Sequence, residues 1–156
     1  MQLLASEEYG LRCLLRVAGS DGAPVAISEI AEAEGLSCEY AAKLLRQMRL
    51  GGLVTSVRGA GGGYRLARPA RQISVWSAIT VLGGEFFPEG FCACHPGQRA
   101  LCVRTTDCSL RALWRTVQRS LRNALEAVSL ADLARDERAM TVWLDGCDGT
   151  TEPLRL

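Results

Sequence analysis

The chain of 156 residues contains a single histidine, His95, and neither a Ser/His/Asp set nor an HExxH motif. Hydrolases and metalloproteases depend on such groups, because these supply the catalytic base and the metal ligands. A lone loop histidine before Pro96 is more typical of an exposed side chain than of a ligand. The sequence therefore favours a protein that is not an enzyme, and no small-molecule substrate is evident.

No hydrophobic run approaches the ~20 residues that a membrane-spanning helix needs, and the N-terminus lacks the features of a signal peptide. We therefore expect a cytoplasmic protein with no membrane partner. Thiols stay reduced in that compartment, and the cysteine count is odd at seven, so a disulfide framework is not expected. Metal ligation or redox chemistry is favoured instead. Cys13, within a predicted helix, is expected to pack as a small hydrophobic side chain.

Acidic residues are absent from residues 40–84, although the net charge of the whole chain is only +1. Residues 1–39, in contrast, carry seven acids against two arginines. A solvated basic face is one explanation, but a block of this length is more typical of a surface that binds phosphates. The seven cations of this segment are Lys43, Arg46, Arg49, Arg58, Arg65, Arg68 and Arg71.

Apolar periodicity predicts three short helices over residues 6–18, 27–34 and 38–50, with Ser37 as the N-cap of the third. Two short helices joined by a glycine turn, the second with a basic outer face, are typical of a helix-turn-helix with a recognition helix. The polar face of that helix is expected to consist of Tyr40, Lys43, Arg46, Gln47 and Arg49.

Two strand-like runs, 53–57 and 64–68, flank a glycine-rich stretch and predict a β-hairpin wing. Glycines such as Gly61 and Gly62 permit close backbone approach to a phosphate ridge or a minor groove, where Arg58 can follow. A nucleotide-binding glycine loop is the competing interpretation. Its GxGxxG spacing fails because Tyr64 stands where a glycine is required.

A long amphipathic helix is predicted after Ser109, its expected N-cap, with an apolar stripe that continues to Val128. The stripe could pack against its own domain, but a dimer helix is favoured, because bacterial DNA-binding proteins usually pair to match two half-sites. Its residues are Leu110, Leu113, Trp114, Val117, Leu121, Leu125 and Val128.

The expected fold is therefore mainly α with a small β-wing. It comprises a winged helix-turn-helix (1–84), a cysteine-bearing loop (85–109), a dimerisation helix with a following turn (110–133) and a C-terminal tail (134–156).

Four cysteines fall within 17 residues directly before the long helix: Cys92, Cys94, Cys102 and Cys108. Thiolates are soft ligands, and sets of three or four suit iron–sulfur clusters or zinc. Zinc sites usually use closely spaced cysteine pairs, which these intervals fit poorly, whereas a cluster tolerates wider separation. Free or disulfide-switching thiols are the remaining alternative.

With these motifs the chain resembles the BadM/Rrf-two family of winged-helix transcription regulators over about residues 1–133. The resemblance rests on residues 3–10, 27–31, 36–37, 40, 52–64, 113–114 and 130–133. It implies a homodimer that binds a palindromic promoter site in double-stranded DNA, with the recognition helix in the major groove and the wing in the minor groove. The residues expected to contact DNA are Ser37, Tyr40, Lys43, Arg46, Arg58, Gly61, Gly62 and Arg65.

Cluster-bearing members of this family place three cysteines in the loop before the dimer helix. The resemblance implies Cys94, Cys102 and Cys108 as ligands of an iron–sulfur cluster, 4Fe–4S being favoured over 2Fe–2S. It also implies Glu8 of the opposite subunit as the fourth ligand, with Cys92 as the alternative. Otherwise Glu8 is expected to form a surface pair with Arg12.

The sequence thus predicts a dimeric DNA-binding regulator whose affinity is controlled by an iron–sulfur cluster sensing iron, redox state or nitric oxide. A zinc- or thiol-switch regulator of the same fold is the first alternative. A different class, an iron–sulfur carrier or assembly protein, is the second. The acid-free segment argues against a carrier, which needs no such helix and wing.

Overall fold

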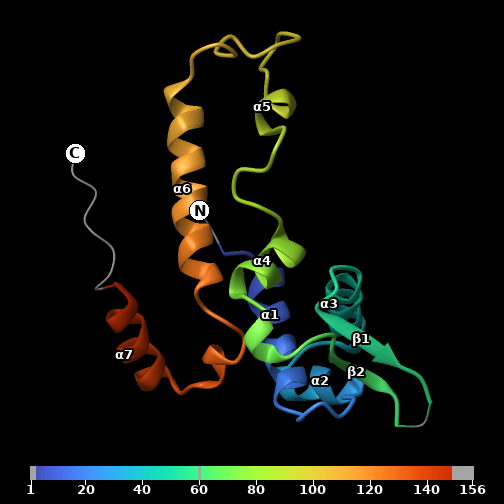
Figure 1. The fold of residues 1–156 in the computed structure, drawn as a ribbon. Coiled ribbons are helices and arrows are strands. Elements are labelled where there is room, and N and C mark those ends of the chain that lie inside the picture. Colours follow the sequence, from blue (N-terminus) through green and yellow to red (C-terminus); the bar gives the residue numbers. More distant parts are fainter. Residues whose placement is uncertain (1–2, 60, 149–156) are drawn as a thin grey trace.

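The computed structural model describes residues 3–59 and 61–148. A winged-helix domain lies at the base of an elongated molecule, and a long helix rises from it to a loop at the far end (Figure 1). Within the described ranges, no helix is both long and apolar enough to cross a membrane. The predicted fold class, mainly helical with a small wing, is confirmed. The elements are α1 (Ala5–Ala18), α2 (Ile27–Glu34), α3 (Cys38–Leu50), β1 (Val54–Val57), β2 (Gly63–Leu66), a 3-10 turn (Ala70–Gln72), α4 (Val75–Gly83), α5 (Phe91–Cys94), α6 (Ser109–Glu126), a second 3-10 turn (Asp132–Ala134) and α7 (Glu137–Asp148).

Two residues before α3, Gly35 and Ser37, determine where this predicted recognition helix begins. α2 ends at Gly35, which adopts the left-handed conformation with φ 66°, and the chain turns at once into α3. The hydroxyl of Ser37 accepts a hydrogen bond from the backbone N–H of Tyr40 at 3.2 Å. This side chain satisfies one of the amides that a helix start leaves unpaired, so α3 begins where the sequence predicts.

The hydrophobic core lies between α1, α2, α3, α4 and the first strand. Cys13 is fully buried in it, as predicted, and burial raises the pKa of its thiol to about 11. Leu130, which follows α6, also belongs to this core. Its backbone N–H donates to the carbonyl of Ile73 at 2.8 Å, which returns the chain from α6 to the winged-helix domain. Other fully buried side chains are Leu14, Ile30, Leu44, Leu45, Met48 and Leu53.

The wing is an antiparallel hairpin of β1 and β2, in which Val54 lies opposite Leu66. Tyr64 extends the ladder by exchanging two backbone hydrogen bonds with Val25, at 2.8 and 2.9 Å. A side chain on Gly63 would collide with the carbonyl of Val25, so glycine is required where the third segment crosses. The predicted wing is confirmed, and the loop between α1 and α2 anchors its base.

Two features differ from the sequence-based expectation. Cys108, and not Ser109, is the N-cap of α6, because its sulfur accepts a hydrogen bond from the N–H of Arg111 at 3.4 Å. The second feature is α7, which lies in the region predicted only as a tail. Residues 149–156 of that region lie outside the described residues, and the side chain of Cys147 is likewise not described.

Candidate nucleic-acid interface and cysteine site

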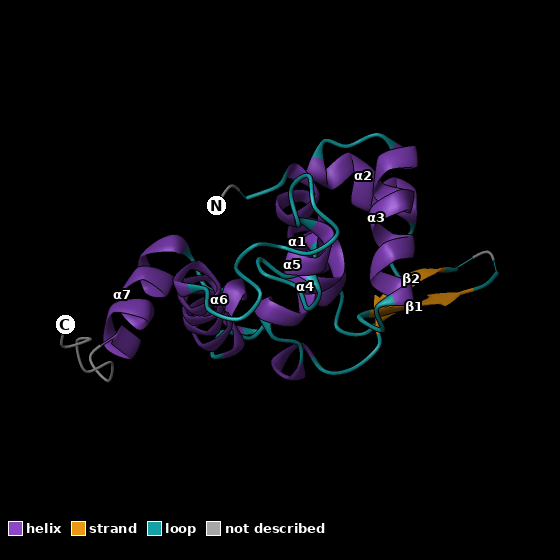
Figure 2. Cartoon of the chain, turned by 90° about the horizontal axis from the view of Figure 1, so that it is seen from above, coloured by secondary structure: helices purple, strands orange, loops and turns teal. Residues whose placement is uncertain are grey.

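The recognition helix α3 and the wing lie at one end of the molecule, away from α6 and α7 (Figure 2). Their basic side chains are exposed, and among residues 3–59 and 61–148 none of them pairs with a carboxylate. In contrast, Arg12 pairs with Glu34 at 2.9 Å, and Arg16 pairs with Glu29 at 3.1 Å. A set of exposed, unpaired cations generates the positive potential that attracts phosphate. The set comprises Lys43, Arg46, Arg49, Arg58, Arg65 and Arg68.

The other predicted DNA contacts lie on the same two elements. The hydroxyl of Ser37 is already used as the helix cap. Tyr40 is half-buried, with its ring edge-on to that of Tyr9 at 6.1 Å between centroids. Gly61 is exposed at the wing tip, whereas Gly62 folds so tightly that a Cβ would lie 2.5 Å from the carbonyl oxygen of Val57. At positions 61 and 62 the wing therefore presents bare backbone.

Gln47 departs from the predicted polar face. Its side-chain amide turns inward and donates to the carbonyl oxygens of Val81 at 2.7 Å and Leu82 at 3.0 Å. The helical wheel places Gln47 beside the exposed cations, but the wheel carries no information about the unpaired carbonyls at the end of α4. The expectation that Gln47 projects outward is therefore wrong.

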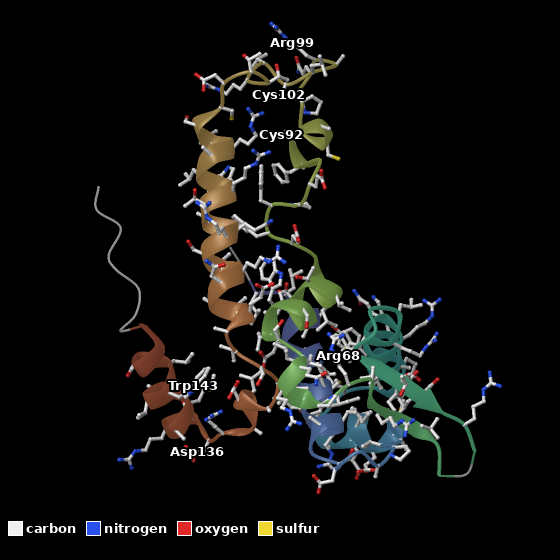
Figure 3. The ribbon with its side chains drawn as sticks, viewed as in Figure 1. Arg68, Cys92, Arg99, Cys102, Asp136 and Trp143 are labelled. Atoms are coloured by element: carbon white, nitrogen blue, oxygen red, sulfur yellow. The ribbon has the colours of Figure 1, made fainter. Side chains whose placement is uncertain are left out.

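The cysteine loop occupies the far end of α6, and Figure 3 shows Cys92 on α5 and Cys102 further along the loop. Cys92, Cys102 and Cys108 line one pocket of about 210 Å³. Cys94 has an exposed side chain and does not line this pocket. Over the described ranges, no three His, Cys, Asp or Glu side chains converge closely enough to hold a single metal ion. In the structure, Cys92 rather than Cys94 therefore lines the same pocket as Cys102 and Cys108.

The surroundings of this pocket suit an anionic, thiolate-bound group. Cys108 stands at the N-terminus of α6, where unpaired N–H groups and the helix dipole favour negative charge. Arg104 and Arg111 line the same pocket. His95 is engaged elsewhere, because its ring stacks on Phe91 at 4.1 Å and its Nδ1 hydrogen-bonds to the carbonyl oxygen of Phe91 at 2.8 Å. Among the described residues, the possible soft ligands at this pocket are therefore the sulfur atoms of Cys92, Cys102 and Cys108, which are the type of ligand that iron–sulfur clusters use.

Glu8 is exposed on α1, which lies at the base of the molecule, whereas the cysteine loop lies at the opposite end of α6 (Figure 1). Within one subunit these two sites are therefore apart. The alternative role of Glu8, a salt bridge to Arg12, is also not formed, because Arg12 pairs with Glu34.

The sequence stripe of α6 divides into two faces. Trp114 meets Phe86 edge-on at 6.0 Å, and Leu121 and Leu125 line an apolar pocket of about 260 Å³ together with Trp76. This inner face packs against the chain's own α4. The outer face consists of Leu110, Leu113 and Val117 of the stripe, continued by residues 120 and 124, which lie outside it. These five positions follow the alternating three- and four-residue spacing of a coiled-coil seam. Leu110 and Leu113 are 52% and 49% exposed there, while Val128 is buried in the core.

Sequence reasoning missed Glu7 and Gln118. Glu7 is buried, and its carboxylate accepts a hydrogen bond from the N–H of Leu4 at 2.6 Å at the start of α1. Only half of the capping-box pattern is present, because the glutamate follows three residues after Leu4, which has no hydroxyl group, so the sequence signal for this contact is weak. Gln118 accepts a hydrogen bond from the N–H of Phe87 at 2.6 Å. No local sequence pattern predicts this hydrogen bond, because Phe87 and Gln118 are 31 positions apart.

Comparison with known proteins agrees with this geometry. The family model Rrf2, described as iron-dependent transcriptional regulator, matches residues 4–136. Protein rrf2 of Nitratidesulfovibrio vulgaris is 36% identical over 138 residues, which cover 87% of this chain and 89% of that protein. The solved structure of T. potens IscR is similar with a TM-score of 0.67 at 34% identity, covering 89% of this chain and 90% of that one. CymR, the global cysteine regulator of B. subtilis, is similar with a TM-score of 0.66 at 28% identity, covering 86% and 96%.

Proposed function

Because the chain belongs to the Rrf2 family of transcriptional regulators, we propose that it binds its operator as a homodimer and that an iron–sulfur cluster in the cysteine loop sets its affinity. The observation that carries this proposal is the division of the molecule: an unpaired basic surface on α3 and the wing, and a thiol-lined pocket at the far end of α6. A DNA-binding regulator needs the first, and a sensor of iron or redox state needs the second.

On the DNA side, Lys43 and Arg46 of α3 lie along the phosphate backbone of the major groove, while Tyr40 and Ser37 are close to base edges. The wing enters the minor groove, where Arg58 follows and the bare backbone of Gly61 and Gly62 permits close approach. Arg65 contacts phosphate from β2. The operator is palindromic, because the two subunits of a symmetric dimer present the same helix to two half-sites.

In the cysteine loop, Cys102 and Cys108 provide two ligands. The third thiolate comes from the Cys92/Cys94 pair. The family resemblance favours Cys94, and the lining of the pocket favours Cys92. The fourth ligand is Glu8 of the partner subunit, since α1 of the same subunit lies at the opposite end of α6. When bound, a cluster of this kind, 4Fe–4S in our proposal, supplies redox chemistry and an iron made labile by its carboxylate ligand.

The test is anaerobic purification followed by visible absorption and by iron and sulfide analysis for each chain. Cys102→Ser and Cys108→Ser should each abolish the absorbance, and a comparison of Cys92→Ser with Cys94→Ser identifies the third ligand. Glu8→Ala should weaken cluster retention, whereas Glu32→Ala, an exposed acid on α2, serves as its control. Protein that retains neither iron nor sulfide under these conditions would contradict the proposal.

A thiol switch is the second candidate. Cys94 is exposed and Cys92 lies two positions before it, so both can react with an oxidant without a metal. Peroxide would oxidise two thiols to a disulfide and would itself be reduced to water. The distinguishing experiment treats iron-free protein with peroxide, maps disulfides by mass spectrometry and measures DNA affinity. A disulfide that changes the affinity of iron-free protein would favour this candidate.

A further inference from the structure

One short stretch, Val81–Phe87, forms the covalent link between the winged-helix domain and the cysteine loop, and we refer to it as the connector segment. Two glutamines from different helices hold it. Gln47 of α3 donates to the carbonyls of Val81 and Leu82, at 2.7 and 3.0 Å. Gln118 of α6 accepts from the N–H of Phe87 at 2.6 Å and donates to the carboxylate of Glu85 at 3.0 Å.

The Gln47 contact has a clear physical basis. The last carbonyls of α4 have no partner further along the helix, and those of Val81 and Leu82 receive theirs from a single side-chain amide. Gln47 therefore acts as a C-terminal cap supplied by the recognition helix. A neutral amide is required, because a carboxylate at this position would face two carbonyl oxygens with no proton to donate.

Close packing makes this junction stiff. A Cβ on Gly51, at the end of α3, would lie 2.5 Å from the side chain of Val81. A Cβ on Gly10 of α1 would collide with Leu82 in the same way. The last turn of α4 thus lies directly against the backbone of α1 and α3, with no side chain between them to absorb a displacement. A shift of the connector segment must move α3, because packed interiors respond as units.

We infer that Gln47 and Gln118 form a relay by which the state of the cysteine loop is transmitted to the recognition helix. This inference rests on the proposed sensing function of the loop. Gln118 couples the connector segment to α6, about two helical turns after Arg111, in the same rigid helix that begins at Cys108. Gln47 couples the same segment to α3 and is a positioning residue: it sits on the recognition helix but faces away from the DNA surface. Rearrangement of the loop shifts the segment and changes the tilt of α3.

The experiment compares the affinities of cluster-loaded and cluster-free protein for one duplex, selected from a random-sequence pool by the loaded wild-type protein. Couplings of this kind typically amount to about 5- to 150-fold in affinity. Gln47→Met and Gln118→Met keep the side-chain length but remove the hydrogen bonds. In each variant the ratio of the DNA affinity of cluster-loaded protein to that of cluster-free protein should lie within about twofold of one, while the cluster absorbance stays unchanged. Gln72→Met, at an exposed position outside the relay, should keep the wild-type ratio.

Hydrogen exchange supplies a readout that does not need DNA. In the wild type, loss of the cluster should change amide exchange in α3, and in either relay variant this change should disappear. Variants that keep both the wild-type affinity ratio and the exchange response would overturn the relay. If the wild-type protein itself shows a ratio of one, the proposed sensing function fails, and the relay fails with it.

Discussion

On the proposed DNA-binding surface, arginines that contact base edges can be distinguished by experiment from arginines that contact phosphate. Arg58 stands at the wing and Arg46 on the outer face of α3, both exposed and unpaired in the described part of the chain. If Arg58 reaches base edges, Arg58→Ala should weaken operator binding by roughly 1–3 kcal/mol, and more for the operator than for random DNA. Arg46→Ala should instead lower the slope of log affinity against log salt by about one. Fluorescence anisotropy over a salt series measures both effects, and identical effects of the two variants would refute the distinction.

The side chain of Asp132 stabilises the turn by which the chain leads from α6 back to the hydrophobic core. Its carboxylate accepts hydrogen bonds from the hydroxyl and the N–H of Ser129 and pairs with Arg135 at 2.6 Å, which together lower its pKa below the usual value. The pKa is lower in the folded chain, so the stabilisation is complete above the unfolded-state pKa of about 3.9 and is lost as the pH falls through the folded-state pKa.

Asp132→Ala should therefore lower the free energy of unfolding at pH 7 by about 1.5–3 kcal/mol, the usual contribution of hydrogen bonds to a charged group. The difference from the wild type should begin to shrink below about pH 4, where Asp132 of the unfolded chain takes up a proton first, and should be smallest once the pH has fallen through the lowered pKa of folded Asp132. Denaturant unfolding at a series of pH values checks this, and a difference that does not vary with pH would contradict it.

Among the elements, α3 and the wing could be predicted because their signals are local. Ser37 lies directly before α3, and glycines bracket the strands. α6 was predictable as a helix but not in its packing, since periodicity shows that a stripe is apolar without showing what covers each part. Trp114 and Leu121 face the chain's own domain, whereas Leu113 faces outward. The choice between Cys92 and Cys94 could not be made from the sequence, because four residues are too few to show a helical period. The short helix α5 was therefore not expected, and it is in this helix that Cys92 lines the pocket while Cys94 is exposed.

The outer face of α6 gives a test of dimerisation. In the predicted stripe, Leu121 would have been the natural choice, but its contacts with the chain's own pocket mean that Leu121→Asp would also disturb the subunit. Leu113→Asp changes a side chain that is 49% exposed in the single chain and should yield a folded monomer, since a charge in the seam has no partner. Ala112→Asp, on the far side of the same turn, should remain dimeric. Sedimentation analysis with circular dichroism measures both, and a dimeric Leu113→Asp protein would place the interface elsewhere.

Across the whole molecule, the hydrophobic core and the proposed sensing loop lie in different places. Cys13 is fully buried in the winged-helix core, whereas Cys102 lies in the loop at the far end of α6 (Figure 3). Replacing cysteine by serine should therefore affect folding stability at position 13 and cluster binding at position 102. Cys13→Ser places a hydroxyl in an apolar site and should lower the free energy of unfolding by about 1–3 kcal/mol while the cluster absorbance is retained.

Cys102→Ser should abolish the absorbance but leave the unfolding of cluster-free protein unchanged, because its side chain lies outside the core. Denaturant unfolding of cluster-free protein and anaerobic absorption spectra measure the two properties separately. Loss of stability in cluster-free Cys102→Ser would show that the loop contributes to the folded core.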